Sequence, residues 1–220
     1  MKILAVSDQE CAALWEYYTP GRLSEYDLII SCGDLRSDYL SFLVTMARCP
    51  VLYVHGNHDT GYEKFPPEGC DCIDDSLVVY RGIRIMGLGG CRKYHDGPHQ
   101  YTEAQMRGRI RRMWLSLWRE KGVDILVTHA PPAGLGDAQD AAHRGFEALL
   151  PFLEKYKPRY LLHGHVHPMG IDPQREHTSG ETRIINVYER CTLEIPDVPY
   201  DPQDKHRVIW KTKEREQNYV

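Results

Sequence analysis

Short runs of apolar residues, each closed by polar side chains, recur along the chain. They are Ile3–Val6, Asp27–Ser31, Val51–Val54, Ile125–Thr128 and Tyr160–Leu162. Runs this short with little alternation are typical of strands buried on both faces. An Asp, Asn or His follows shortly after each run, as Asp8 follows the first. In layered α/β folds the C-terminal ends of strands meet at one edge of the sheet. We therefore expect these polar side chains to share one cleft.

Helical segments are expected between these strands. Gln9–Tyr18 and Ser37–Ala47 link the first three runs and predict βαβ units with a parallel core. Residues 102–105 form a capping box, and apolar residues at helical spacing follow it through position 117. Gly145–Lys155 is a further expected helix, in which Pro151 should produce a kink or start a new turn.

Arginines crowd the helix that follows the capping box. They are Arg107, Arg109, Arg111 and Arg112, on or near the face opposite its apolar positions. A solvated helix face explains them better than a phosphate-binding patch, which stays the alternative.

The remaining pattern predicts antiparallel elements. Leu77–Tyr80 and Ile83–Leu88, joined by Arg81 and Gly82, are typical of a hairpin. Arg183–Val187 and Thr192–Ile195 are expected to extend the second sheet. Periodicity alone thus gives an α/β fold, with a domain over residues 1–195 and a tail of unknown role over residues 196–220.

Composition narrows the class of protein. The 220 residues carry a formal net charge of −4, so the multiple phosphate contacts needed for long nucleic acid are disfavoured. Seven cysteines at irregular spacing in a chain this long favour reduced thiols. The apolar run at the N-terminus is too short for a signal peptide, and no run reaches membrane-spanning length. We expect a cytoplasmic protein without a membrane partner.

Five short motifs carry the candidate chemistry. They are Ser7-Asp8, Gly33-Asp34, Gly56-Asn57-His58-Asp59, Thr128-His129-Ala130-Pro131-Pro132 and Gly164-His165-Val166-His167. In this order they resemble the signature blocks of the calcineurin-like metallophosphoesterases, which hydrolyse phosphate esters with two adjacent metal ions. The resemblance covers roughly residues 1–190. It implies a four-layer αββα sandwich of two mixed β-sheets flanked by helices.

The resemblance also implies a role for each motif residue. Asp34 would bridge both metal ions, Asp8 and His167 would bind the first, and the remaining ligands of the second would be Asn57, His129 and His165. His58 would protonate the leaving-group oxygen as general acid, oriented by Asp59. Mixed oxygen and nitrogen ligands suit two divalent ions, with Mn²⁺ favoured and Fe, Zn or Mg as alternatives.

One position departs from the family pattern. The first block normally reads Asp-x-His, whereas this chain has Asp8-Gln9-Glu10. Glu10 as a ligand would make the first site harder and more anionic, favouring Mn²⁺ or Mg²⁺. The alternative is that Glu10 points to solvent or caps the helix that follows.

Three residues are candidate substrate contacts. Arg92 follows the glycine-rich run 87–90, with an ordinary surface arginine as the alternative. His143 and Arg144 follow the His-Ala-Pro-Pro block, a segment that resembles the class III cyclic-nucleotide phosphodiesterase and metallophosphodiesterase branch. Their alternative role is to anchor the helix that begins near Phe146. Histidines 55 and 163, beside predicted ligands, are interpreted as structural or supporting.

These features favour a metal-dependent phosphohydrolase, specifically a phosphodiesterase acting on a small soluble phosphate ester. A phosphomonoesterase of the same fold and an impaired scaffold that binds a protein partner are the alternatives. The departure at Glu10 motivates the scaffold hypothesis, whereas the intact histidines oppose it. The sequence encodes neither the natural substrate nor the oligomeric state.

Overall fold

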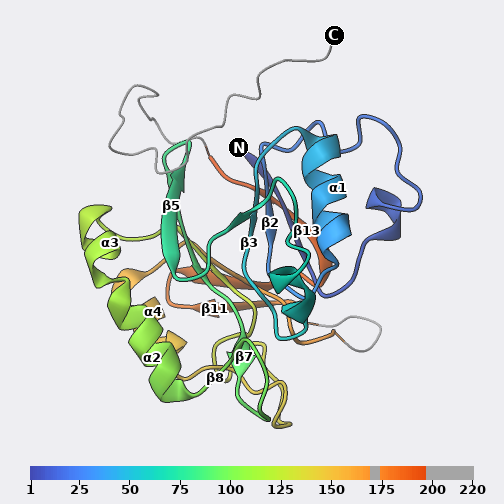
Figure 1. The fold of residues 1–220 in the computed structure, drawn as a ribbon. Helices are drawn as coiled ribbons and strands as arrows, with labels where there is room; N and C mark the ends of the chain where they lie inside the picture. The colour runs from blue at the N-terminus through green and yellow to red at the C-terminus, as the bar shows by residue number, and fades with distance from the viewer. Residues whose placement is uncertain (169–173, 197–220) are drawn as a thin grey trace.

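The computed structural model describes residues 1–168 and 174–196 (Figure 1). Its strands form two large sheets and one short pair. The first sheet has the order β13-β1-β2-β3-β4, formed by Glu189–Glu194, Lys2–Ser7, Leu28–Ser31, Val51–Tyr53 and Asp71–Cys72. The second has the order β11-β12-β10-β9-β6-β5, formed by Glu176–Ser179, Thr182–Asn186, Tyr160–His163, Ile125–Thr128, Ile83–Leu88 and Ser76–Tyr80. The short pair consists of β7 (Cys91–Arg92) and β8 (Gln100–Tyr101).

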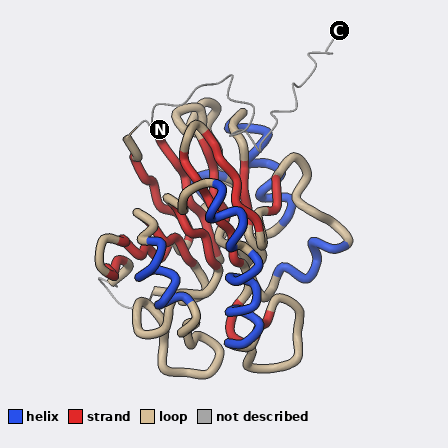
Figure 2. The backbone as a smooth tube through the Cα atoms, turned by 90° about the vertical axis from the view of Figure 1, so that its left-hand side faces the viewer, coloured by secondary structure: helices blue, strands red, loops and turns tan. Residues whose placement is uncertain are grey.

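Helices cover the two outer faces (Figure 1). They are α1 (Ser37–Ala47), α2 (Glu103–Arg112), α3 (Trp114–Arg119) and α4 (Leu149–Tyr156), with 3-10 turns at Ala12–Leu14 and Asp59–Glu63. In the turned view of Figure 2 the strands run side by side through the middle of the molecule. Within the described residues, no helix has the length and apolar character needed to span a bilayer.

The strands bury both faces, which explains the sandwich. Along β1, Ile3 and Ala5 belong to the core cluster between the two sheets, whereas Leu4 and Val6 pack with α1. On β9, Val127 faces the same central cluster, and a third cluster joins the second sheet to α2, α3 and α4. Because strand side chains alternate, three apolar layers separate four structural layers. The predicted αββα sandwich is therefore confirmed.

The hairpin and the capping box are also confirmed. β5 and β6 pair antiparallel, and Arg81 and Gly82 both adopt positive φ, as a tight two-residue turn requires. Thr102 and Gln105 make both hydrogen bonds of the capping box.

Two element predictions were wrong, and a third helix begins later than expected. Gln9–Tyr18 is not an α-helix: only Ala12–Leu14 is helical, in a 3-10 turn. Trp15 stacks on Tyr39 and Phe42 of α1, so side-chain packing outweighs a helical propensity that aromatic residues already weaken. The helix expected over Gly145–Lys155 is present but begins at Leu149, and Pro151 lies in its first turn, where no backbone donor is needed.

The last strand also lies elsewhere than expected. β13 pairs antiparallel with β1 in the first sheet, with Lys2 opposite Glu194, rather than extending the second sheet. Of the two segments expected to extend the second sheet, only β12 does so, parallel to β10. The proposed tail over 196–220 falls outside the described residues except for Pro196.

Candidate metal centre

Five of the seven predicted ligands line one hollow, beyond the C-terminal ends of strands from both sheets. Asp8 follows β1, Asp34 follows β2, and Asn57 follows β3; His129 and His165 follow β9 and β10. The hollow has a volume of about 430 Å³ and is lined by Asp8, Asp34, Asn57, His58, Tyr94, Ala142, His143, His165 and His167. Seven of the nine lining residues were named from the sequence.

Asp34, His129 and His165 form the centre of the site. One possible ligand atom from each lies within 4.8 Å of the others. His129 Nε2 is 3.3 Å from Asp34 Oδ2 and 3.1 Å from Asn57 Oδ1. His129 Nδ1 lies 2.8 Å from the carbonyl oxygen of Cys32 and donates to it, so that Nε2 faces the cluster. A carbonyl partner of this kind fixes which nitrogen of a histidine binds a metal ion.

A second carbonyl orients His165. Its Nε2 donates to the carbonyl oxygen of Ala142 at 2.7 Å, which leaves Nδ1 as its lone-pair nitrogen. The backbone N–H of His165 lies 3.0 Å from both carboxylate oxygens of Asp8. His167 lies further out, with Nε2 3.8 Å from Asp8 Oδ1 and its side chain 60% exposed. Asp8 and His167 thus stand together at one side of the cluster.

The backbone is strained at these positions. Asp8, Asp34 and His165 have φ values of 63°, 56° and 65°. Non-glycine residues seldom adopt this left-handed region, and strain of this kind concentrates at functional sites. Gly33 precedes Asp34 with φ of 96°, and a Cβ there would collide with the backbone of Gly56. The ligand loops after β2 and β3 can touch only because glycine stands at this contact.

Charges in the cluster are strongly coupled. Burial would raise the pKa of Asp34, but the facing His129 outweighs burial and lowers it to about 2. Burial would lower the pKa of His129, but Asp34 raises it to about 9. For His165, burial and then the charge of His129 lower the pKa to about 3, so its ring is neutral. Buried carboxylate, amide and imidazole donors that converge in this way fit a divalent metal ion.

Asp59 hydrogen-bonds to the backbone of two ligand loops. Its Oδ2 accepts hydrogen bonds from the backbone N–H groups of Gly56 at 2.7 Å and Asp34 at 3.0 Å. Burial raises its pKa to about 6. Asp59 therefore ties two ligand loops together through their backbones, and its role in orienting His58 stays a prediction. The backbone N–H of His58 donates to Asp34 Oδ1 at 2.8 Å, and His58 is exposed at the mouth of the hollow.

Glu10 points away from the cluster. Its Oε1 accepts the backbone N–H of Arg36 at 3.2 Å, just before α1. It lines a neighbouring groove and is absent from the residues around the metal hollow. This geometry favours the capping alternative over metal ligation. The helix that Glu10 contacts is α1, however, and not the segment directly after Glu10.

Of the three predicted substrate contacts, the structure brings one to the hollow. His143 lines it, with its ring centroid 5.1 Å from that of His165 and its Nδ1 2.9 Å from Asp140 Oδ1. Arg92 lines a neighbouring hollow that shares Tyr94 with the metal hollow, and Arg144 is exposed and is not among the residues that line the metal hollow. Sequence reasoning missed Tyr94, whose hydroxyl accepts from Asn57 Nδ2 at 3.4 Å. The sequence signal that could have identified Tyr94 was its place two positions after Arg92, a residue already named as a candidate substrate contact.

A partly buried ion pair adjoins the ligand loop that carries Asn57. His55 Nδ1 lies 2.7 Å from Asp74 Oδ2, while Asp74 Oδ1 accepts the N–H of Gly89 at 2.7 Å. Burial alone would lower the pKa of His55, but its hydrogen bond to Asp74 raises it to about 10. Arg109 donates to the carbonyl of Gly89 at 2.6 Å and is only 3% exposed. The prediction that Arg109 belongs to a solvated helix face was therefore wrong.

His99 completes a second group of possible ligands with His55 and Asp74. The two imidazole rings are stacked, 4.3 Å apart and 7° from parallel. A metal ion in the plane of one ring would lie well outside the plane of the other. This arrangement suits a ring stacked on the His55–Asp74 ion pair and not a metal ion shared by the two rings. A supporting role for His55 agrees with this stacking. His163 is fully buried, with Nδ1 3.0 Å from the carbonyl oxygen of Gly164, which agrees with its interpretation as a structural residue.

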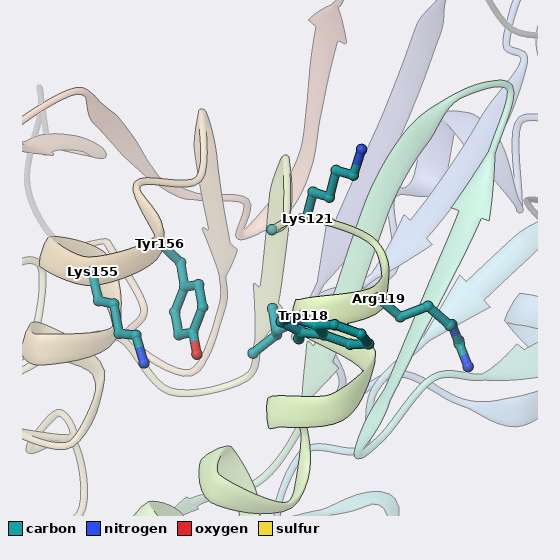
Figure 3. Close-up of a pocket in the computed structure, with 7 residues that line it drawn as sticks. Trp118, Arg119, Lys121, Lys155 and Tyr156 are labelled. Carbon is teal, nitrogen blue, oxygen red and sulfur yellow. The ribbon is translucent and has the colours of Figure 1, made fainter.

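A further hollow lies between α3 and α4 (Figure 3). It has a volume of about 700 Å³ and is lined by Trp118, Lys121, Lys155 and Tyr156, among others. None of the predicted site residues lines it, so it is separate from the metal hollow.

Comparisons with known proteins identify the family of the chain. Residues 1–169 match the family model described as calcineurin-like phosphoesterase. Two Caenorhabditis elegans proteins are similar: UPF0046 protein C25E10.12 is 27% identical over 78% of this chain and 67% of its own, and UPF0046 protein K07C11.7 is 23% identical over 85% and 69%. The solved structure of TT1561 from Thermus thermophilus aligns with a TM-score of 0.60 at 16% identity, covering 86% of this chain and 89% of its own. With its fold, its candidate metal ligands and a family match over most of its length, the chain belongs to the calcineurin-like phosphoesterase family.

Proposed function

We propose that the protein is a metal-dependent phosphodiesterase that hydrolyses a small soluble phosphate ester in the cytoplasm. The observation that carries this proposal is the convergence of Asp34, His129, Asn57 and His165 in a hollow whose mouth holds His58. Two divalent ions, Mn²⁺ first among them, would neutralise phosphoryl charge there and lower the pKa of a bound water. The resemblance of the His129 segment to class III phosphodiesterases supports a diester substrate.

The chain's own residues then have distinct tasks. Asp34, Asn57, His129 and His165 would hold one metal position, and Asp34, Asp8 and His167 the other; of these side chains Asp8 is buried and His167 is exposed. His143, fixed by Asp140, faces the space beside His165 and would contact a phosphoryl oxygen. His58 is exposed at the mouth and would give a proton to the leaving-group oxygen.

Because Glu10 bonds to Arg36, the metal position assigned to Asp8 and His167 has one ligand fewer than predicted. An impaired scaffold that binds a protein partner is therefore the second candidate. Hydrolysis of bis-p-nitrophenyl phosphate and p-nitrophenyl phosphate, each with Mn²⁺, Fe²⁺, Zn²⁺ and Mg²⁺, separates the two. Preferential diester turnover that Asn57→Ala abolishes would establish the phosphodiesterase. Absence of turnover with every metal, together with fewer than one bound ion per chain, would refute it.

A further inference from the structure

A second, open groove adjoins the metal hollow. It has a volume of about 610 Å³, within the range of small-molecule sites. The two cavities share Asp34, a central candidate ligand, and His58, the candidate general acid. A phosphorus atom held in the metal hollow therefore has the groove directly beyond His58. That is where the group leaving phosphorus, once protonated by His58, would lie.

The charges of the groove disfavour an anionic leaving group. The N-terminus of α1 faces it, and a helix N-terminus would ordinarily attract a phosphate. Here carboxylates occupy two of the donors: Glu10 accepts the N–H of Arg36, and Asp38 Oδ1 accepts that of Tyr39 at 3.0 Å. The Arg36 guanidinium makes two hydrogen bonds to Asp38, at 3.0 and 2.6 Å. Arg36, which lines the groove, is thereby paired.

An exposed aromatic ring provides the complementary feature. Phe65 lines the groove and is 73% exposed, with Leu35 and Tyr62 adding buried apolar surface beside it. A ring this exposed can stack on a planar group, and stacking of a nucleic-acid base on an aromatic side chain contributes about 1–3 kcal/mol.

We infer that this groove binds the leaving-group half of the substrate, and that this half is an uncharged planar group such as a nucleoside. The inference rests on the proposed function and narrows its substrate class. Nucleoside phosphodiesters fit, because their leaving group carries no phosphate. Dinucleoside polyphosphates do not fit, because their leaving phosphate would meet the carboxylates of Glu10 and Asp38.

The test uses two substrates that differ by one phosphate in the leaving group: adenylyl-adenosine and diadenosine diphosphate. Phe65→Ala should raise the KM for adenylyl-adenosine about 5- to 100-fold, with kcat changed less than about twofold. Asp38→Asn, which frees Arg36, should raise kcat/KM for the diphosphate relative to the diester. Tyr17→Ala is the matched control, because Tyr17 is equally exposed at 73% but does not line the groove.

Equilibrium dialysis of adenosine against the same proteins gives a readout independent of turnover. Wild type and Tyr17→Ala should bind adenosine, and Phe65→Ala should bind it at least about fivefold more weakly. Equal binding by all three overturns the inference, even when bis-p-nitrophenyl phosphate is hydrolysed and the proposed function stands. Phe65-dependent binding without hydrolysis of any diester would instead support the groove and refute the proposed function.

Discussion

Replacement of Gly33 by alanine should damage the fold and the metal centre together. A Cβ at this position adds two costs: a left-handed backbone for a non-glycine residue, about 1–2 kcal/mol, and a collision with the backbone of Gly56, typically about 1–3 kcal/mol. The sum is about 2–5 kcal/mol, equivalent to a fall in Tm of about 4–20 °C for a chain of this size. Displacement of the neighbouring Asp34 and Asn57 should also weaken Mn²⁺ binding about tenfold or more.

Gly21 provides the matched control. It has φ of 86°, close to that of Gly33, but a Cβ there would meet nothing within 4 Å. Gly21→Ala should therefore show only the backbone cost, about 1–2 kcal/mol, with unchanged Mn²⁺ affinity. Differential scanning calorimetry and Mn²⁺ titration of both variants measure the two effects. If Gly33→Ala melted no lower than Gly21→Ala and bound Mn²⁺ like wild type, the close contact between the loops would not matter.

Three further outcomes are expected. His58→Ala should lower turnover of a diester with a poor leaving group about 10²–10⁴-fold and that of a p-nitrophenyl ester much less; equal losses would exclude a general-acid role. Glu10→Gln should leave the number of bound Mn²⁺ ions unchanged, because Glu10 bonds Arg36; loss of one ion by elemental analysis would restore Glu10 as a ligand. Asp74→Asn should cost about 3 kcal/mol in urea unfolding at pH 7. The raised pKa of His55 makes its share of that stability complete below about pH 6.5 and lost as pH rises through about 10, so a gap that did not narrow between pH 7 and pH 11 would contradict the pairing.

Local pattern was sufficient for much of the site, because each motif ends a strand whose apolar run identifies it. Asp8, Asp34 and Asn57 could be placed together without knowing how the sheets pack. Contacts between distant segments could not be found in this way. The pairing of Lys2 with Glu194 depends on which sheet edge is open after the other strands have formed, and no local period encodes it.

Side-chain contacts between loops could not be predicted for a related reason. Glu10 and Asp59 both accept backbone N–H groups supplied by other loops, so their partners depend on tertiary distances. The stretch after Glu10 carries polar and apolar residues at helical spacing, but the ring of Trp15 finds Tyr39 and Phe42 in α1. That packing decides the backbone there.

The hydrogen bond from His165 to the carbonyl of Ala142 depends on the backbone position of the loop over residues 133–145 and not on its side chains. A carbonyl oxygen belongs to the backbone, so many side chains at position 142 would leave the orientation of His165 intact. Asp137 fixes the span of the loop, since its carboxylate accepts the N–H of Gly134 at 2.8 Å and of Gly145 at 3.0 Å. The loop thus acts as a spacer of set length, in which a one-residue deletion would be more harmful than most substitutions.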